Sequence, residues 1–259
     1  MDPVLTIFRL GEAERAFGTY GLMLMLAVVV GVGIATRAAA VAKLDVGAVI
    51  AAAGFTVAGA LAGAWSLFIV VEWLRTGSPM DALEHGGLVF YGAPMGGGAA
   101  YAFAVRVLDL PGFRLLDLAI PGVPAAHAMG RIGCFLGGCC FGRPWDGPWA
   151  VHYGHPAAPA SLYGVARHPV PLYESMILLG LAFVLLLWPK RKTGDGRWVG
   201  AYLVAYAVIR SSVETLRGDA MRGSVAGLLS TSQLISVGMG SVGLFLIWRA
   251  HRRSASMPA

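Results

Sequence analysis

Long apolar stretches separated by short polar ones dominate the sequence, and this pattern predicts helices that span a membrane. A spanning helix needs about 17–25 mostly apolar residues, and such stretches recur along almost the whole chain. The predicted windows are 20–36, 48–72, 88–105, 117–136, 172–188, 199–214 and 230–248. The sequence therefore predicts an all-α integral membrane protein, a seven-transmembrane-helix bundle that forms a single polytopic domain over residues 1–259.

The longest segment outside these windows covers residues 137–171, which are rich in Gly, Pro, Trp and His. A long loop of this composition is typical of a functional lid, so we expect a small extracytoplasmic head or lid here. The alternative is that its tryptophans lie at the lipid interface, where this residue type is enriched.

Composition supports a membrane protein: 57% of residues are hydrophobic and 13% are charged, about half the charged share of a soluble domain. Residues 1–17 carry Arg9, Glu12, Glu14 and Arg15 before any long apolar run, unlike a cleavable signal peptide, so the first span is expected to be retained. The net charge of +6 is spread over loops, which favours membrane orientation over nucleic-acid binding.

The distribution of basic residues predicts which side of each span faces the cytoplasm. Lys43, Lys190 and Lys192 are the only lysines and fall in loops on one side of the predicted bundle. The positive-inside rule assigns that side to the cytoplasm, with the N-terminus outside and the C-terminal tail inside. In this topology the polar residues of several spans lie toward the outer leaflet, as in an active site that opens there.

Two arginines interrupt windows that are otherwise apolar: Arg131, within GRIGCF, and Arg210, within YAVIRSS. A charge inside a bilayer costs several kcal/mol, so it is usually kept to hold a partner or a ligand. The guanidinium fork suits bidentate phosphate binding, which indicates an anionic ligand such as a lipid phosphate. The alternative is a structural ion pair, because Arg210, Glu214 and Arg217 have helical i, i+4 and i+7 spacing.

Two further segments carry candidate chemistry. Residues 85–92 (HGGLVFYG) form a glycine-dense entry into a span, which can present amide donors to an anion or simply allow close helix packing. Residues 167–175 (RHPVPLYES) begin the fifth span, where Glu174 suits a helix N-terminus. His168 is a candidate general base, although Glu174 and His168 equally suit a plain interfacial cap.

The only cysteines, Cys134, Cys139 and Cys140, cluster at the outer end of the fourth window. We expect small apolar packing for Cys134, and a redox or structural role stays open for the adjacent pair. The alternatives are a reactive thiol near Arg131, a disulfide between Cys134 and one neighbour, or a metal site completed by His127, His155 or His168. Because the spacing C-x4-C-C matches no strong metal-binding pattern, no metal and no cofactor are expected.

Together these segments resemble the prolipoprotein diacylglyceryl transferases, over nearly the whole chain and in the family's order. The matching segments are TYGLM from Thr19, GGLVFYG from Gly86, GRIGCF from Gly130, HPVPLYE from His168, RSSVETLR from Arg210, and Ser232-Gln233. The resemblance implies a seven-span fold with an outward N-terminus and a periplasmic head, in the bacterial inner membrane.

The same resemblance implies the activity and the site. Members transfer the diacylglyceryl group of phosphatidylglycerol to the lipobox cysteine thiol in the signal peptide of a prolipoprotein, releasing glycerol 1-phosphate. The expected partners are therefore these two substrates and membrane lipid, with no nucleic acid. The candidate catalytic residues are Arg131, Arg210 and Tyr91. The candidate substrate-binding residues are Tyr20, Gly86, Gly87, Gly92, Gly133, His168, Tyr173, Glu214 and Arg217.

The chain also departs from the family pattern. Tyr91 stands where many members have a histidine proposed to act in catalysis, and Cys134, Gly137 and Cys139 stand where the signature usually has Asn, Asn and Glu. A tyrosine with a reference pKa of about 10 is a poor base at neutral pH. Two rival functions are an anionic-lipid transporter or flippase, and a thiol-redox membrane protein that uses Cys139 and Cys140.

Overall fold

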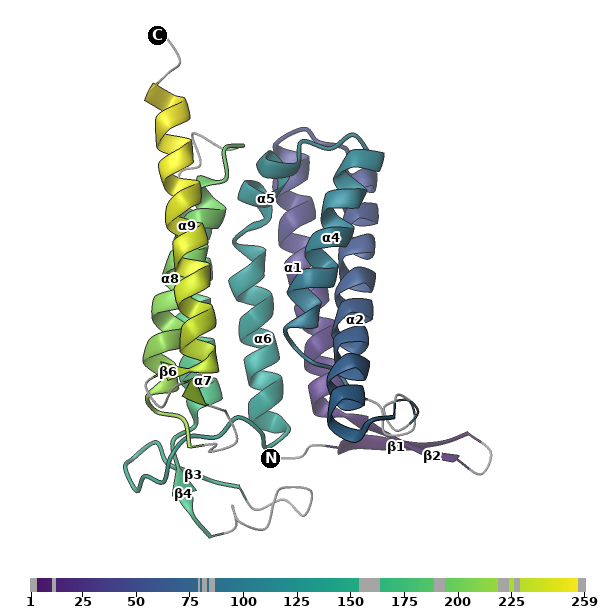
Figure 1. The fold of residues 1–259 in the computed structure, drawn as a ribbon, viewed down its shortest axis with the longest axis vertical. Coiled ribbons are helices and arrows are strands. Elements are labelled where there is room, and N and C mark those ends of the chain that lie inside the picture. Colours follow the sequence, from purple (N-terminus) through teal and green to yellow (C-terminus); the bar gives the residue numbers. More distant parts are fainter. Residues whose placement is uncertain are drawn as a thin grey trace. The chain divides into compact units, whose positions relative to one another are not determined.

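The computed structural model describes residues 4–10, 13–78, 80, 83, 87–153, 164–188, 194–218, 224–225 and 229–255. The helices are α1 (Thr19–Val41), α2 (Val46–Thr76), α4 (Gly92–Val107), α5 (Gly112–Ala119), α6 (Gly122–Leu136), α7 (Val170–Leu187), α8 (Arg197–Glu214) and α9 (Thr231–Ala255) (Figure 1). The strands are β1 (Val4–Leu10), β2 (Ala13–Gly18), β3 (Val151–His152), β4 (Ala166–Arg167), β5 (Ser224–Val225) and β6 (Leu229–Ser230).

Within the described residues, four helices are long and apolar enough to cross a membrane: Thr19–Val41, Val46–Thr76, Val170–Leu187 and Ser232–Arg253. This confirms an integral membrane protein made mainly of helices. The windows 88–105 and 199–214 also form helices, α4 and α8, but α4 has 16 residues and α8 contains Arg197, Arg210 and Glu214. The count of seven spans therefore stays a prediction.

The fourth predicted window, 117–136, is wrong as a continuous helix. The structure ends α5 at Ala119 and begins α6 at Gly122. Pro121 lies at the junction, where it has no N–H to donate and its ring would clash with the carbonyl of Asp117 in an unbroken helix. The break separates Asp117 from the helix that carries Arg131.

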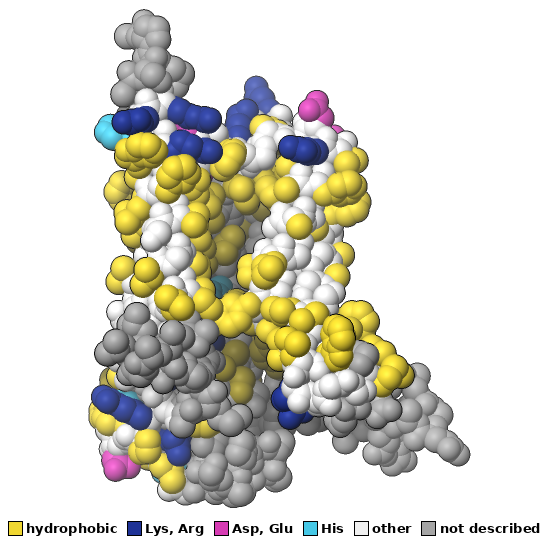
Figure 2. All heavy atoms as spheres, viewed as in Figure 1, with side chains coloured by type: hydrophobic (Ala, Val, Ile, Leu, Met, Phe, Trp, Pro, Cys, Tyr) yellow, Lys and Arg dark blue, Asp and Glu magenta, His cyan; other side chains and the backbone are white. Residues whose placement is uncertain are grey.

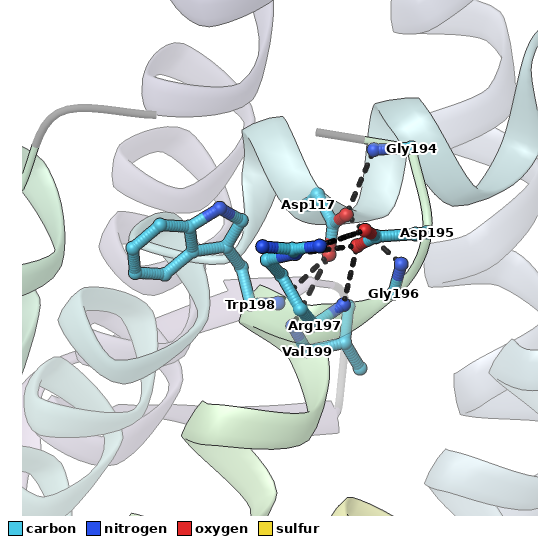
Figure 3. A network of polar contacts seen from close by, with 7 residues as sticks. All are labelled: Asp117, Gly194, Asp195, Gly196, Arg197, Trp198 and Val199. Atoms are coloured by element: carbon cyan, nitrogen blue, oxygen red, sulfur yellow. Dashed lines mark hydrogen bonds and ion pairs between the residues drawn. The ribbon is translucent and has the colours of Figure 1, made fainter. Parts of the chain in front are cut away.

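The Asp117 carboxylate, which is completely buried, holds the start of α8 (Figure 3). Its Oδ2 accepts hydrogen bonds from the backbone N–H groups of Gly194 (2.9 Å) and Gly196 (3.0 Å). Its Oδ1 accepts from those of Trp198 (3.2 Å) and Val199 (3.3 Å). The first N–H groups of a helix have no partner within the helix, so Asp117 caps the helix that carries Arg210.

Two compact units make up the chain: residues 1–34 with 116–259, and residues 35–115. In the second unit, α2 packs directly on α4 through glycines (Figure 1). A Cβ on Gly92 would lie 2.1 Å from the carbonyl oxygen of Gly63, and one on Gly63 would lie 2.3 Å from that of Gly92. Only glycines allow two backbones to approach this closely, as in other membrane helix pairs.

In the first unit, α8 and α9 lie side by side (Figure 1). Gly200 meets Gly243 near the start of α8, while Arg210 meets Ser232 near its end, so the two helices are antiparallel. Figure 2 shows hydrophobic side chains along α9 and basic ones around its C-terminal end, where Arg252 and Arg253 lie in the last turn. A helix with this exposed apolar surface suits a lipid environment.

Short strands accompany the helices. β1 pairs antiparallel with β2, so the described residues before α1 form a hairpin, which the sequence analysis did not predict. Within the predicted head, β3 pairs antiparallel with β4, and the backbone of Pro144 forms an isolated antiparallel β-bridge with that of Arg167. β3 and β4 have two residues each, which is too short to show in a hydrophobicity pattern that needs several residues of alternation.

Candidate functional site

A completely buried carboxylate lies between α6 and α7, beside the first of the two arginines. Arg131 Nη2 is 3.1 Å from Glu174 Oε1. Tyr206 of α8 donates its hydroxyl to the same oxygen at 3.4 Å, and His127 Nε2 lies 4.0 Å from it. The interfacial cap considered for Glu174 is therefore wrong: this residue is the ion-pair partner of Arg131.

The second arginine lies between α8 and α9 and is also buried. Arg210 Nη2 lies 2.5 Å from Glu214 Oε2 and donates to Ser232 Oγ at 2.9 Å. The i, i+4 pair expected from the sequence is present. The expected third member, Arg217, lies beyond the end of α8, and its backbone forms an isolated antiparallel β-bridge with Gly142 of the head.

Each arginine keeps one buried N–H without a hydrogen-bond partner among the described residues: Nε of Arg131 and Nη1 of Arg210. A buried polar group without a partner costs free energy, and in a native protein it calls for an explanation. The guanidinium groups of Arg131 and Arg210 both lie close enough to His127 to act on its ring electrostatically, so the two arginines belong to the same site. The arrangement suits an anion with several oxygen acceptors.

The head is tied to the end of α8 next to this cluster. Arg143 donates its backbone N–H to the carbonyl of Leu216 at 3.0 Å, and Gly142 donates its own to that of His168 at 3.0 Å. His168 stacks on Trp145, with ring centroids 4.2 Å apart, and its Nδ1 lies 3.4 Å from the Tyr173 hydroxyl. Burial lowers the pKa of His168, and Arg143 lowers it further, which favours the neutral ring.

The first-span tyrosine belongs to the same unit. Tyr20 packs on α6 at Gly133, where a Cβ would lie 3.2 Å from the tyrosine ring and 2.9 Å from Met23 Cβ. The glycine of the GRIGCF segment thus allows α1 to approach the helix turn next to Arg131. Tyr20 is 46% exposed, so much of its side chain remains accessible to a ligand.

The glycine-rich segment and Tyr91 belong to the other compact unit. Gly87 packs against the Phe68 ring and Gly92 against the Gly63 backbone, which matches the close-packing alternative for these glycines. Tyr91 directly precedes α4 and is partly exposed. Gly86 and His85 lie outside the described residues.

The three cysteines converge just after α6. Their sulfur atoms all lie within 4.8 Å of one another, and all three are free thiols. Hydrogen bonds with Cys134 and Cys139, and then with Arg217, lower the pKa of the Cys140 thiol. His127 and His168, considered as further ligands, do not belong to this group, and His155 lies outside the described residues.

The sequence did not indicate that Glu174, His127, Tyr206 and Ser232 lie beside the two arginines. Ser232 was named only in the matching Ser232-Gln233 pair, and His127 only as a possible metal ligand. Glu174 carried a readable signal, because an acidic residue at the start of a span needs a basic partner if it is buried. Tyr206 lies one helical turn before Arg210, on the same face, as i and i+4 residues do. His127 has the same relation to Arg131.

Comparison with known proteins identifies the family of this chain. The family model for prolipoprotein diacylglyceryl transferase matches residues 6–249. The phosphatidylglycerol–prolipoprotein diacylglyceryl transferase of Clostridium tetani is 36% identical over 191 residues, covering 73% of this chain and 75% of the relative. That of Synechococcus elongatus is 31% identical over 247 residues, covering 90% and 84%. That of Gloeobacter violaceus is 31% identical over 250 residues, covering 93% and 91%. The chain therefore belongs to the prolipoprotein diacylglyceryl transferase family.

Proposed function

We propose that this protein transfers the diacylglyceryl group of phosphatidylglycerol to the lipobox cysteine thiol of prolipoproteins and releases glycerol 1-phosphate. The observation that carries this assignment is the pair of arginines, Arg210 buried and Arg131 mostly buried, each with a buried N–H that no described residue accepts. Family membership supports the same activity, and the names of the relatives favour a transferase over a transporter or a redox protein.

In this reaction the acceptor thiolate attacks a glyceryl carbon, and the bond from that carbon to a phosphate oxygen breaks. Negative charge then grows on the leaving phosphate. Arg131 and Arg210 are suited to bind it, because a guanidinium stays charged and offers several donors in a fixed plane. Fixed positive charge in a site that excludes water is usually the largest contribution to catalysis of this kind.

The two glutamates give each arginine a fixed position. Glu174 accepts from Arg131 at one nitrogen and Glu214 pairs with Arg210 at another, so the remaining N–H groups keep a set direction. Such preorganisation means that little rearrangement is needed when the phosphate binds. Tyr20, Gly133, Tyr173 and Arg217 are proposed to bind substrate beside the arginines. Tyr91, Gly86, Gly87, Gly92 and His168 are proposed as site residues on the family resemblance alone.

We also propose the orientation in the membrane. The basic C-terminal end of α9, with Arg252 and Arg253, would face the cytoplasm by the positive-inside rule. The start of α8 lies beside that end, whereas Arg210 and Glu214 lie at the opposite end of α8. The arginine cluster and the head would then belong to the outer half of the inner membrane, with the N-terminus outside.

The test is complementation of a cell depleted of its own transferase, with lipid attachment to a lipoprotein read by mass spectrometry. The wild-type chain should restore the diacylglyceryl mass, and Arg210→Ala should not. Arg252→Ala is a matched control because Arg252 is exposed at the far end of α9, against Trp248. Restoration by Arg210→Ala, or no lipid attachment by wild-type protein that is inserted in the membrane, would overturn the proposal.

A further inference from the structure

The three thiols after α6 are arranged like the ligands of a single metal ion. Zinc binds thiolate sulfur at about 2.3 Å, so three sulfurs in a tetrahedral site lie about 3.8 Å apart. Cys134, Cys139 and Cys140 place theirs within 4.8 Å of one another. Closing the site therefore needs shifts of no more than about 1 Å, which side-chain torsions can supply.

The backbone is bent in a way that brings the third thiol into this group. Cys139 donates its N–H to the carbonyl of Cys134 at 3.0 Å, which folds the chain back at the end of α6. Cys140 then adopts a left-handed conformation with φ of 61°. For a residue other than glycine this costs of order 1 kcal/mol, and such strain is typically retained where function requires it.

The surroundings suit an anionic metal complex. A divalent zinc ion with three thiolates carries one net negative charge. Arg217 hydrogen-bonds to Cys140, and Arg131 lies close enough to interact electrostatically with Cys134 and Cys140. Donors that surround ligating sulfurs stabilise the thiolate form and hold the ligands in place.

The number of ligands is the informative feature. Structural zinc sites have four protein ligands, whereas catalytic sites have three and keep a position open. In the part of the chain that the structure describes, the group consists of three cysteines alone. Soft thiolate ligands select zinc or copper(I) over hard cations, and an open position on such an ion favours another thiol.

We propose that Cys134, Cys139 and Cys140 form a Zn²⁺ site whose open fourth position binds the acceptor cysteine as a thiolate. This inference rests on the proposed transferase function and departs from the expectation of no metal. The acceptor S–H gives its proton to solvent as the Zn–S bond forms, because a coordinated thiol is deprotonated. Its sulfur then attacks the glyceryl carbon, and the departing phosphate oxygen takes the electron pair of the broken C–O bond.

The first experiment measures metal in purified protein in detergent, reduced and then loaded with Zn²⁺, by elemental mass spectrometry. We expect about one zinc per chain, lost in Cys139→Ser and in Cys140→Ser. His251→Ala is the control, because His251 is an exposed potential ligand on α9. The zinc site would be overturned if wild-type protein bound no zinc, or if both cysteine variants kept it. Loss of zinc in His251→Ala would also overturn it, as would a disulfide among the three cysteines that survives reduction.

The second experiment tests the open position with Co²⁺ in place of zinc. A lipobox peptide should change the cobalt–thiolate absorption, and the same peptide with Ser for Cys should not. No difference between the two peptides would overturn acceptor binding at the metal.

Transfer assays separate failure of this inference from failure of the proposed function. About 3% of a thiol with a pKa near 8.5 is ionised at pH 7, so loss of the zinc should slow transfer roughly 30-fold at pH 7 and much less near pH 9. Full activity of zinc-free protein at pH 7 would refute the inference and leave the transferase assignment intact. Zinc-loaded protein that transfers no lipid would refute the assignment itself.

Discussion

Replacing Arg131 should have two effects that can be separated, because this side chain pairs with a buried carboxylate and is proposed to bind phosphate. Glu174 is completely buried and 3.1 Å from Arg131. Arg131→Ala leaves that carboxylate without its counter-charge, which typically costs about 3–5 kcal/mol. For a chain of this size, this corresponds to a fall in Tm of roughly 6–20 °C. Loss of one charged donor at the leaving group should lower transfer by about 10²–10³-fold.

The double variant Arg131→Ala/Glu174→Gln distinguishes these effects. The neutral amide removes the buried charge, so most of the lost Tm should return, whereas transfer should stay as low as in Arg131→Ala. Glu174→Gln alone keeps the guanidinium and should retain measurable transfer. Thermal unfolding in detergent and lipid transfer to a lipobox peptide are the two assays. Recovery of transfer together with Tm in the double variant would show that Arg131 serves only to neutralise Glu174.

Three further predictions test other parts of the structure. Asp117→Ala removes four hydrogen bonds from the start of α8 and should destabilise the protein by roughly 2 kcal/mol or more. Thermal unfolding checks this, and an unchanged Tm would contradict the capping role. Burial lowers the pKa of His168, so stability should fall as pH drops below its unfolded pKa of about 6.5; His168→Gln should weaken this dependence, and an identical Tm–pH curve would argue against it. Tyr91→Phe should slow transfer and Tyr91→His should remain active, whereas equal rates for Tyr91→Phe and wild type across pH would make Tyr91 a packing residue.

Hydrophobicity alone located most of the helices, since apolar windows near 20–36, 48–72, 172–188 and 230–248 correspond to helices able to span a membrane. It failed at the junction of α5 and α6, where Ile120 and Pro121 are as apolar as their neighbours. The information there was conformational: proline ends a helix, and a nearby aspartate was available to cap another helix. An average over a window contains neither signal.

The two arginines could be identified from the sequence because charge inside an apolar helix is costly. Their partners could not be assigned in the same way. Glu214 follows Arg210 by four residues and was found, whereas Glu174 reaches Arg131 from a different helix. Long-range pairing depends on which helices pack together, and α6 and α7 are connected through the whole head.

The cysteines show the same limit. Their spacing matches no common metal pattern, so the sequence favoured packing for Cys134 and left the adjacent pair open. Their convergence depends on the turn after α6 and on the left-handed conformation of Cys140. A single strained residue of this kind is not visible in composition or periodicity.

The central claim, that Arg131 and Arg210 bind the phosphate that leaves during lipid transfer, is tested most directly with purified protein, phosphatidylglycerol and a lipobox peptide. The account predicts one glycerol 1-phosphate released for each peptide that gains a diacylglyceryl mass, and loss of both products in Arg131→Ala/Glu174→Gln and in Arg210→Ala, with Arg252→Ala unaffected. Peptide modification at wild-type rates in either arginine variant, in protein shown to be folded, would contradict it.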